Sequence, residues 1–484
     1  MARAYFQPIV LPKSEEELPK SVPTLVNFFV YNSTFGPKEG QEHEKVLFYM
    51  PDKETLDNKI RNIGLCEAMV QFTRKFSPHR PCEAVHTQKR KQLLFQAEPE
   101  YWMVMTVSLP GFEARTKDDK PVVEYREEEV QDAVYTAVLK HTYKMFRLFN
   151  STFERIFDRQ GKEGLKHRLA HFFLRYVNTI RLPQLDLLDI YQGIQFLPLD
   201  KQSFLKIQSF VNLVEQTFSQ IKYTAFLYTD QLVWSGLEQE DMRVLYKYLT
   251  TSLFPLHFSD METFASGMNP PPSRQAGRDS SAGPPPHPGW FMVGPRDLRD
   301  PKAPINTAKI FVNTETEMEE LHLIVYHATS ATVCFMVTSS IMLTYDFCKT
   351  LDGFVGPQLG SLGKMISDQL SKRIMSSDVQ YRFIYFNHMN LAQKSTVHLK
   401  RPPSLGISHY SMRLICDISA DFSRSEEDGE TIMKTAGDYW VVAKRSDQRE
   451  FYIILHNKSA NLIEVNEEVK RMCAMHFNNI FFLD

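Results

Sequence analysis

Runs of strand-like sequence are followed by runs of amphipathic helix, and this order occurs three times along the chain. A strand-like run places apolar residues in succession or alternation between turn residues, whereas a helical run repeats them every three or four positions. In the first round, two strands lead to a helix, two further strands and two long helices. The predicted ranges are 22–35 and 44–51 for the first strands, 56–76 for the helix, 84–95 and 101–109 for the next strands, and 130–145 and 153–180 for the long helices.

The second and third rounds repeat this order in outline, without visible sequence identity to the first. The second round comprises strands at 223–228 and 231–234, a helix at 242–253, strands at 309–313, 321–327 and 332–337, and a helix at 345–374. The third comprises strands at 381–387 and 395–399, a helix at 408–422, strands at 438–443 and 450–456, and a helix at 465–477. Because short turns join many of these strands, the pattern predicts mainly antiparallel sheets flanked by helices, an α+β fold.

Four segments depart from this pattern. Residues 267–304 are dense in Pro, Gly and Ser. Such a composition cannot bury enough apolar surface to offset its ordering entropy, so we predict a disordered loop there. We also predict a disordered N-terminal tail at 1–21, and surface loops at the polar segments 113–120 and 425–430.

Composition and charge narrow the class of protein. The 56 basic and 58 acidic side chains give a formal net charge of 56 − 58 = −2. The chain therefore lacks the excess of positive charge that nucleic-acid-binding proteins use against phosphates. Six scattered cysteines without a CxxC pair suit a reducing compartment. The best transmembrane candidate, 321–342, is interrupted by His322 and His327, and the first 20 residues contain no apolar signal-peptide core. The sequence therefore predicts a cytosolic protein.

Motifs for covalent chemistry fail on inspection. Gly363-Lys364 resembles the end of a phosphate-binding loop, but Met365 stands where a Ser or Thr is required. His167 and His171 share a helix face without the intervening Glu of a zinc protease, which favours a solvated surface. We therefore expect no catalytic residues, no metal and no cofactor, and an interaction protein becomes the leading class.

Four longer strings carry a family resemblance. They occupy 58–78, 222–255, 383–398 and 461–473, and the chain ends on FNNIFFLD. Together they resemble the vacuolar fusion protein CCZ family, over 22–484 and in matching order. The resemblance implies three longin domains, each a mainly antiparallel five-stranded sheet flanked by helices, at 22–182, 183–376 and 377–484.

The same resemblance implies partners and a task. Members of the family pair with a Mon-family longin protein, and the heterodimer is a guanine-nucleotide exchange factor for the late-endosomal Rab GTPase (Rab seven). In animals a third subunit, of the Bulli type, joins them. The implied location is the cytoplasm, with peripheral recruitment to late endosome and lysosome membranes. The alternative is a non-catalytic longin scaffold or tether of the Inturned–Fuzzy type.

The resemblance also implies that helix 56–76 forms part of the Rab surface, because in composite longin pairs the sheets and first helices of the first modules are expected to meet side by side. Its apolar face should pack on its own sheet, and its polar residues should face outward. The alternative is that these residues are only solvated. The candidate Rab contacts are Lys59, Arg61, Asn62, Glu67 and Arg74.

Two further hypotheses concern the Pro-rich segment. Phe258 and Met261 lie in an amphipathic pattern that suits a lipid surface, or, alternatively, a helix packed on the second module. Trp290 and Val293 have the aromatic-x-x-aliphatic spacing of motifs that add a strand to ubiquitin-like autophagy proteins. The alternative is that Trp290 folds back onto the second module.

Overall fold

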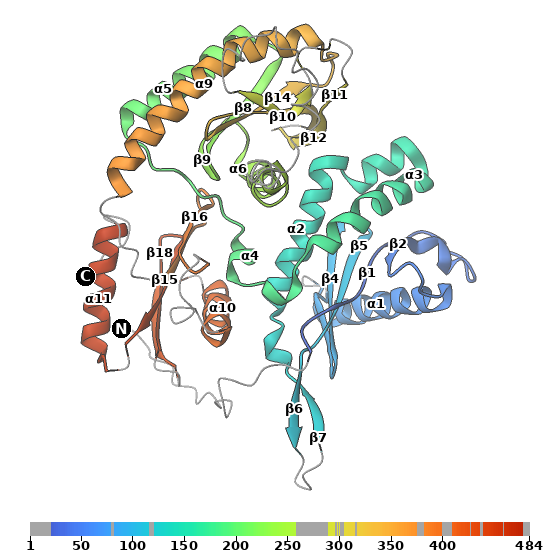
Figure 1. The fold of residues 1–484 in the computed structure, drawn as a ribbon. Helices are drawn as coiled ribbons and strands as arrows, with labels where there is room; N and C mark the ends of the chain where they lie inside the picture. Colours follow the sequence, from blue (N-terminus) through green and yellow to red (C-terminus); the bar gives the residue numbers. More distant parts are fainter. Residues whose placement is uncertain are drawn as a thin grey trace.

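The computed structural model describes residues 21–78, 82–115, 121–257, 289–295, 298, 300, 304–314, 317–374, 382–398, 409–425, 427–435, 439–457 and 459–477. These residues form three modules, each an antiparallel sheet with helices on both faces (Figure 1). The predicted α+β class is therefore confirmed. The predicted tail lies outside the described residues apart from Ser21, which forms a bridge with Gly111. Most of the predicted Pro-rich loop also lies outside them.

The first module contains a five-stranded sheet in the order β2-β1-β5-β4-β3. Helix α1 covers one face of this sheet, and α2 and α3 cover the other. The hairpin β6–β7 projects from the module (Figure 1) and begins at Gly111, so the loop predicted at 113–120 is wrong for its first residues. The strands are β1 Leu25–Asn32, β2 Val46–Met50, β3 Ala84–Thr87, β4 Arg90–Glu98, β5 Tyr101–Ser108, β6 Gly111–Arg115 and β7 Pro121–Tyr125; the helices are α1 Leu56–Phe76, α2 Asp132–Asn150 and α3 Phe153–Tyr176.

The second module has seven strands, two more than the resemblance implied. Strand β13 is long enough to pair with β12 along one part of an edge and with β10 along the rest. Strand β10 lies inside the predicted disordered segment, so that prediction is wrong for this stretch. The strands are β8 Ile221–Tyr228, β9 Gln231–Ser235, β10 Trp290–Pro295, β11 Ile305–Asn306, β12 Ala308–Asn313, β13 Met318–Ala328 and β14 Ala331–Thr338. Helices α5 Lys201–Thr217 and α9 Tyr345–Ile374 cover one face, and α6 Gln239–Tyr248 the other.

The third module has a five-stranded sheet in the order β16-β15-β19-β18-β17. Strand β16 ends at Ser395, where the prediction had a strand begin, and β17 starts within the loop predicted at 425–430. Helix α10 packs on the face toward the first module and α11 on the opposite face. The elements are β15 Arg382–Asn387, β16 Ala392–Ser395, α10 His409–Arg424, β17 Gly429–Lys434, β18 Tyr439–Ser446, β19 Arg449–His456 and α11 Leu462–His476.

Helix α2 joins the modules, and the short helix α4 (Leu187–Tyr191) lies beside it in the linker (Figure 1). The α2 side chains Leu139 and Phe146 belong to an apolar core that continues from the first sheet into the third module. Met145 and Leu148 of the same helix belong to the core beneath α6 in the second module. The three modules therefore share buried surface, and the domain boundaries stay a prediction.

Polar contacts also connect the first and third modules. The Glu129 carboxylate lies 2.9 Å from Arg413 and 3.1 Å from His409. His398 lies 2.7 Å from Asp186 in the linker. Hydrogen bonding to these carboxylates raises the pKa of both histidines above the usual value of the side chain. Burial opposes ionisation of Glu129, but His409 and Arg413 outweigh it, and the pKa of Glu129 is lowered.

These pairs predict a pH-dependent contact between the two modules. A histidine whose pKa is raised by folding stabilises the fold fully below its unfolded pKa, and this contribution is lost as pH rises through the folded pKa. The wild-type chain should therefore melt at a higher temperature than His398→Gln/His409→Gln at pH 6, and the difference should shrink by pH 8. A difference in melting temperature that is equal at both pH values would contradict the prediction.

Candidate functional site

Helix α1 is anchored to the outer face of the first sheet by a narrow apolar stripe. The hydroxyl of Thr55 caps the helix by accepting from the backbone N–H of Asn58. Ile63, Cys66 and Val70 are buried against the sheet. Burial raises the pKa of the Cys66 thiol to about 12, so this cysteine is a core residue rather than a nucleophile.

Three of the five predicted contact residues hold α1 on its own module. Lys59 donates to the carbonyl oxygen of Asp52 over 2.9 Å, and the side-chain amide of Asn62 donates to the Tyr49 hydroxyl over 2.7 Å. Glu67 forms an ion pair with Lys45 at 2.8 Å. All three side chains are half-buried. The predicted outward orientation is therefore wrong for Lys59, Asn62 and Glu67, because their spacing places them beside the buried stripe.

Arg74 and Arg61 are exposed. Arg74 donates to the side-chain oxygen of Gln96 over 3.3 Å, and its guanidinium lies 5.8 Å from the centroid of a Trp102 ring. Within the described part of the chain, Arg61 has no hydrogen bond or ion pair. Arg61 is thus the candidate most available to a partner.

The sequence interpretation missed a second apolar stripe on α1. Leu65, Phe72 and Phe76 are 53%, 59% and 76% exposed, and the two phenyl rings lie 5.0 Å apart. Spacings of seven and four residues place these side chains on one side of the helix, away from Ile63 and Cys66. We call Arg61, Leu65, Phe72 and Phe76 the α1 outer face. Several exposed apolar side chains on one side of a helix are typical of interaction surfaces.

The other sequence candidates fall elsewhere. Phe258 and Met261 lie outside the described residues. Trp290 begins β10, pairs with His327 of β13 and packs half-buried on the second module's core. Val293 pairs with Val325 in the same ladder. The autophagy-motif hypothesis requires an unpaired, extended segment, and this requirement is wrong because β13 already pairs with the backbone of Trp290 and Val293. Trp290 instead folds onto the second module, which was the alternative prediction.

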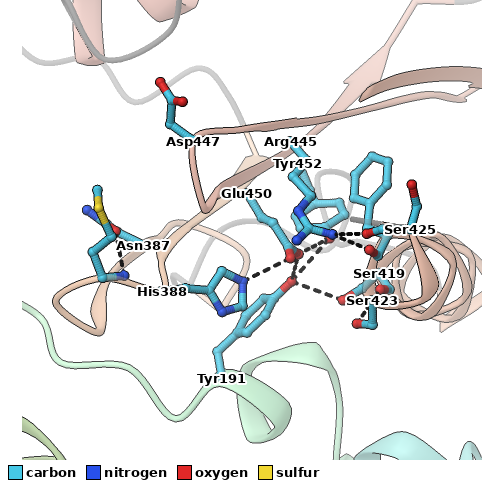
Figure 2. A network of polar contacts seen from close by, with 12 residues as sticks. Tyr191, Asn387, His388, Ser419, Ser423, Ser425, Arg445, Asp447, Glu450 and Tyr452 are labelled. Atoms are coloured by element: carbon cyan, nitrogen blue, oxygen red, sulfur yellow. Dashed lines mark hydrogen bonds and ion pairs between the residues drawn. The ribbon is translucent and has the colours of Figure 1, made fainter. Parts of the chain in front are cut away.

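A buried polar network lies where the linker meets the third module (Figure 2). The Glu450 carboxylate accepts from His388 over 2.9 Å and from the hydroxyls of Tyr191 and Tyr452. Ser419 of α10 contacts the same Tyr191 hydroxyl at 3.0 Å. Burial opposes ionisation of Glu450, but these donors outweigh it and lower its pKa. The donors to this carboxylate all come from the protein itself. Because Tyr191 belongs to α4 and Glu450 to β19, the network joins α4 to the third sheet.

Comparison with known proteins identifies the family. Family models match in order: the first longin domain of INTU, CCZ1 and HPS4 over residues 25–151, Intu longin-like domain 2 over 221–356, and Intu longin-like domain 3 over 377–472. The Vacuolar fusion protein CCZ1 homolog of Nematostella vectensis is 56% identical over 96% of this chain and 99% of its own length. The chain belongs to the CCZ1 family of vacuolar fusion proteins.

Two more distant CCZ1 relatives show how far this similarity extends. The homologue of Danio rerio is 53% identical over 96% of both chains, and that of Dictyostelium discoideum is 32% identical over 95% of this chain and 98% of its own. The resemblance to the CCZ family and the three longin domains are thereby confirmed. In this CCZ1-family chain, α1 and its outer face lie inside the matched first longin domain. None of the described helices is long and apolar enough to span a bilayer.

Proposed function

We propose that this CCZ1-family chain is one subunit of a heterodimeric guanine-nucleotide exchange factor. Its partner would be a Mon-family longin protein, and its substrate the late-endosomal Rab GTPase (Rab seven). The α1 outer face is the observation that carries this proposal, because it joins exposed aromatic rings to an available cation within the first longin domain. Interface cores are enriched in aromatic residues and arginine.

The proposed mechanism needs no covalent chemistry. An exchange factor binds the nucleotide-free GTPase more tightly than the loaded one, and this difference in affinity shifts the Rab toward a state that releases nucleotide. The sheet and α1 would supply a rigid surface on which the GTPase switch regions rearrange. Leu65, Phe72 and Phe76 would bury against the Mon-family partner, and Arg61 would lie at the edge facing the Rab.

The proposal extends to location and to further partners. The complex would act from the cytoplasm, recruited peripherally to late endosomes and lysosomes, in endosome-to-lysosome and autophagosome–lysosome trafficking. A third subunit of the Bulli type would join it in animals. The name vacuolar fusion protein, carried by the relatives, supports a role in membrane traffic.

Release of a fluorescent guanine nucleotide from the Rab tests the proposal. The purified heterodimer should accelerate release, whereas this chain alone should not, because half of the surface belongs to the partner. A scaffold or tether, the second candidate function, would leave release at its spontaneous rate with both subunits present. That result would reject exchange activity.

Charge reversal at Arg61 tests its placement at the Rab. Arg61→Glu should reduce exchange by about tenfold, the loss expected for about 1.4 kcal/mol, while heterodimer formation stays intact. Lys201→Glu is a matched control, because Lys201 is an exposed cation in the second longin domain. Normal exchange in Arg61→Glu, or an equal loss in the control, would remove Arg61 from the Rab surface.

A further inference from the structure

A cavity of about 260 Å³ lies where the first longin domain meets the second. The end of α2, both halves of α3 and strands β12 and β13 surround it, and α2 packs beside β12 (Figure 1). Four of its lining side chains are cationic and one is a carboxylate, which gives 4 − 1 = +3 formal charges. The charged residues are Arg155, Arg159, Arg168, Lys309 and Glu320. A whole chain of charge −2 thus concentrates positive charge here.

A break in α3 brings the three arginines together. Arg155 and Arg159 are four residues apart and share a helix face. Arg168 follows Arg159 by nine residues, which on a regular helix places it on the opposite side, about 180° away. Gly161 interrupts the helix with φ 69° and ψ −176°. Only glycine adopts that conformation readily. The break re-aims the second half of α3 so that Arg168 lines the same cavity as Arg155.

Most of this charge is not neutralised by the protein. Arg155 donates to the carbonyl oxygen of Met318, a neutral group, over 2.9 Å. Lys309 pairs with Glu320 at 2.6 Å. Arg159 and Arg168 are exposed and, among the residues that the structure describes, form no ion pair. Three guanidinium groups with unneutralised charge therefore converge from one helix.

The N-terminus of α3 does not contribute to this site. The Glu98 carboxylate accepts from the backbone N–H groups of Phe153 and Glu154, over 2.5 and 2.9 Å. The first turn of α3 is already occupied by an anion from its own sheet. Recognition in the cavity therefore depends on the side chains.

We propose that this cavity binds a small polyphosphorylated anion, either free or as the headgroup of a phosphorylated lipid. Guanidinium forks match phosphate oxygens in two-point hydrogen bonds. The volume lies just below the usual range of small-molecule sites, about 300–1,000 Å³, which suits a compact group bearing two or three phosphates. Phe149 and Phe311 add apolar walls for a ring or linker between the phosphates. Because α3 and β12 come from different domains, the ligand clamps the first longin domain to the second.

Calorimetric titration of the full chain tests this site. The probes are inorganic pyrophosphate and inositol trisphosphate, at two salt concentrations. We expect saturable binding that Arg159→Ala/Arg168→Ala weakens at least tenfold. Both side chains are exposed, so the double variant should melt like wild type without ligand. The control Arg175→Ala/Lys201→Ala removes two exposed cations elsewhere. It changes the net charge as much as the test variant does, but salt screens charges that lie far from the cavity, so the control should bind within about twofold of wild type.

A second arm separates the two sources of phosphate. Phosphatidylcholine vesicles with and without a phosphorylated phosphatidylinositol are floated with the wild-type chain and with both double variants. If flotation requires both the phosphorylated lipid and the side chains of Arg159 and Arg168, the ligand is a lipid headgroup. If the chain binds only the soluble probes, the ligand is a free anion. Equal weakening in the control variant, or wild-type binding to neither soluble probe nor vesicle, overturns the proposal. None of these readouts depends on exchange activity.

Discussion

Phe72→Asp/Phe76→Asp should abolish pairing with the Mon-family partner, and exchange with it, without unfolding this chain. Both rings are mostly exposed, so in the free chain the substitutions remove little packing. In the complex each ring would act as an aromatic anchor worth about 2 kcal/mol or more. Their joint loss of about 4 kcal/mol weakens pairing about a thousandfold. Sedimentation of the mixed subunits measures pairing, and nucleotide release measures exchange.

The matched control for this prediction places aspartate at other exposed apolar positions. Met342 and Leu462 are 87% and 55% exposed and lie in the second and third modules. Met342→Asp/Leu462→Asp should leave pairing unchanged, which excludes a general effect of added negative charge. An intact heterodimer in the Phe72/Phe76 variant would place the partner surface away from the α1 outer face.

Tyr191→Ala should destabilise the junction between the linker and the third module by about 3–5 kcal/mol, the usual cost of removing a buried aromatic ring. The Tyr191 ring stacks on Phe386 with centroids 4.3 Å apart, and its hydroxyl donates to the buried Glu450. The milder Tyr191→Phe removes only that donor and should cost about 1–3 kcal/mol. Thermal unfolding and limited proteolysis within residues 182–200 measure the effect.

Tyr439→Ala is the control for a lost tyrosine ring. Tyr439 is half-buried on β18 and stacks on His456 of the neighbouring strand. Its removal should lower the melting temperature less and leave residues 182–200 resistant to protease. Equal proteolysis in both variants would show that Tyr191 has no special part in fastening the linker.

The strongly periodic helices were predictable from the sequence alone. Helix α1 spans the predicted residues 56–76, because Thr55 caps its start and Pro78 follows its end, and α9 spans the predicted 345–374. Helix α5 was missed although Ile207, Val211 and Val214 recur at helical spacing and are buried. Strand β10 was missed for another reason, since Pro, Gly and Ser dominate its surroundings in the sequence, and its ladder partners β13 and β11 lie further along the chain.

The candidate site was less predictable than the fold. The sequence identified α1 as the helix of interest, but it did not separate polar residues that fasten the helix from those that face outward. Counting the spacing from Cys66 would have placed Glu67 and Asn62 beside the buried stripe, and would have left Leu65, Phe72 and Phe76 without a core to join. The contact between Tyr191 and Glu450 joins residues 259 positions apart and has no local sequence signal.

The core shared by the first and third modules has a consequence for how the protein is synthesised. Its residues Leu187 and Ile384 are separated by about 200 positions, which a ribosome translates in about 10–40 s at roughly 5–20 residues per second. During that interval the apolar surface that later receives α10 is present on the nascent chain without its cover. A chain that stops before α10 would keep this surface exposed, so we expect truncated products to be retained by chaperones and degraded.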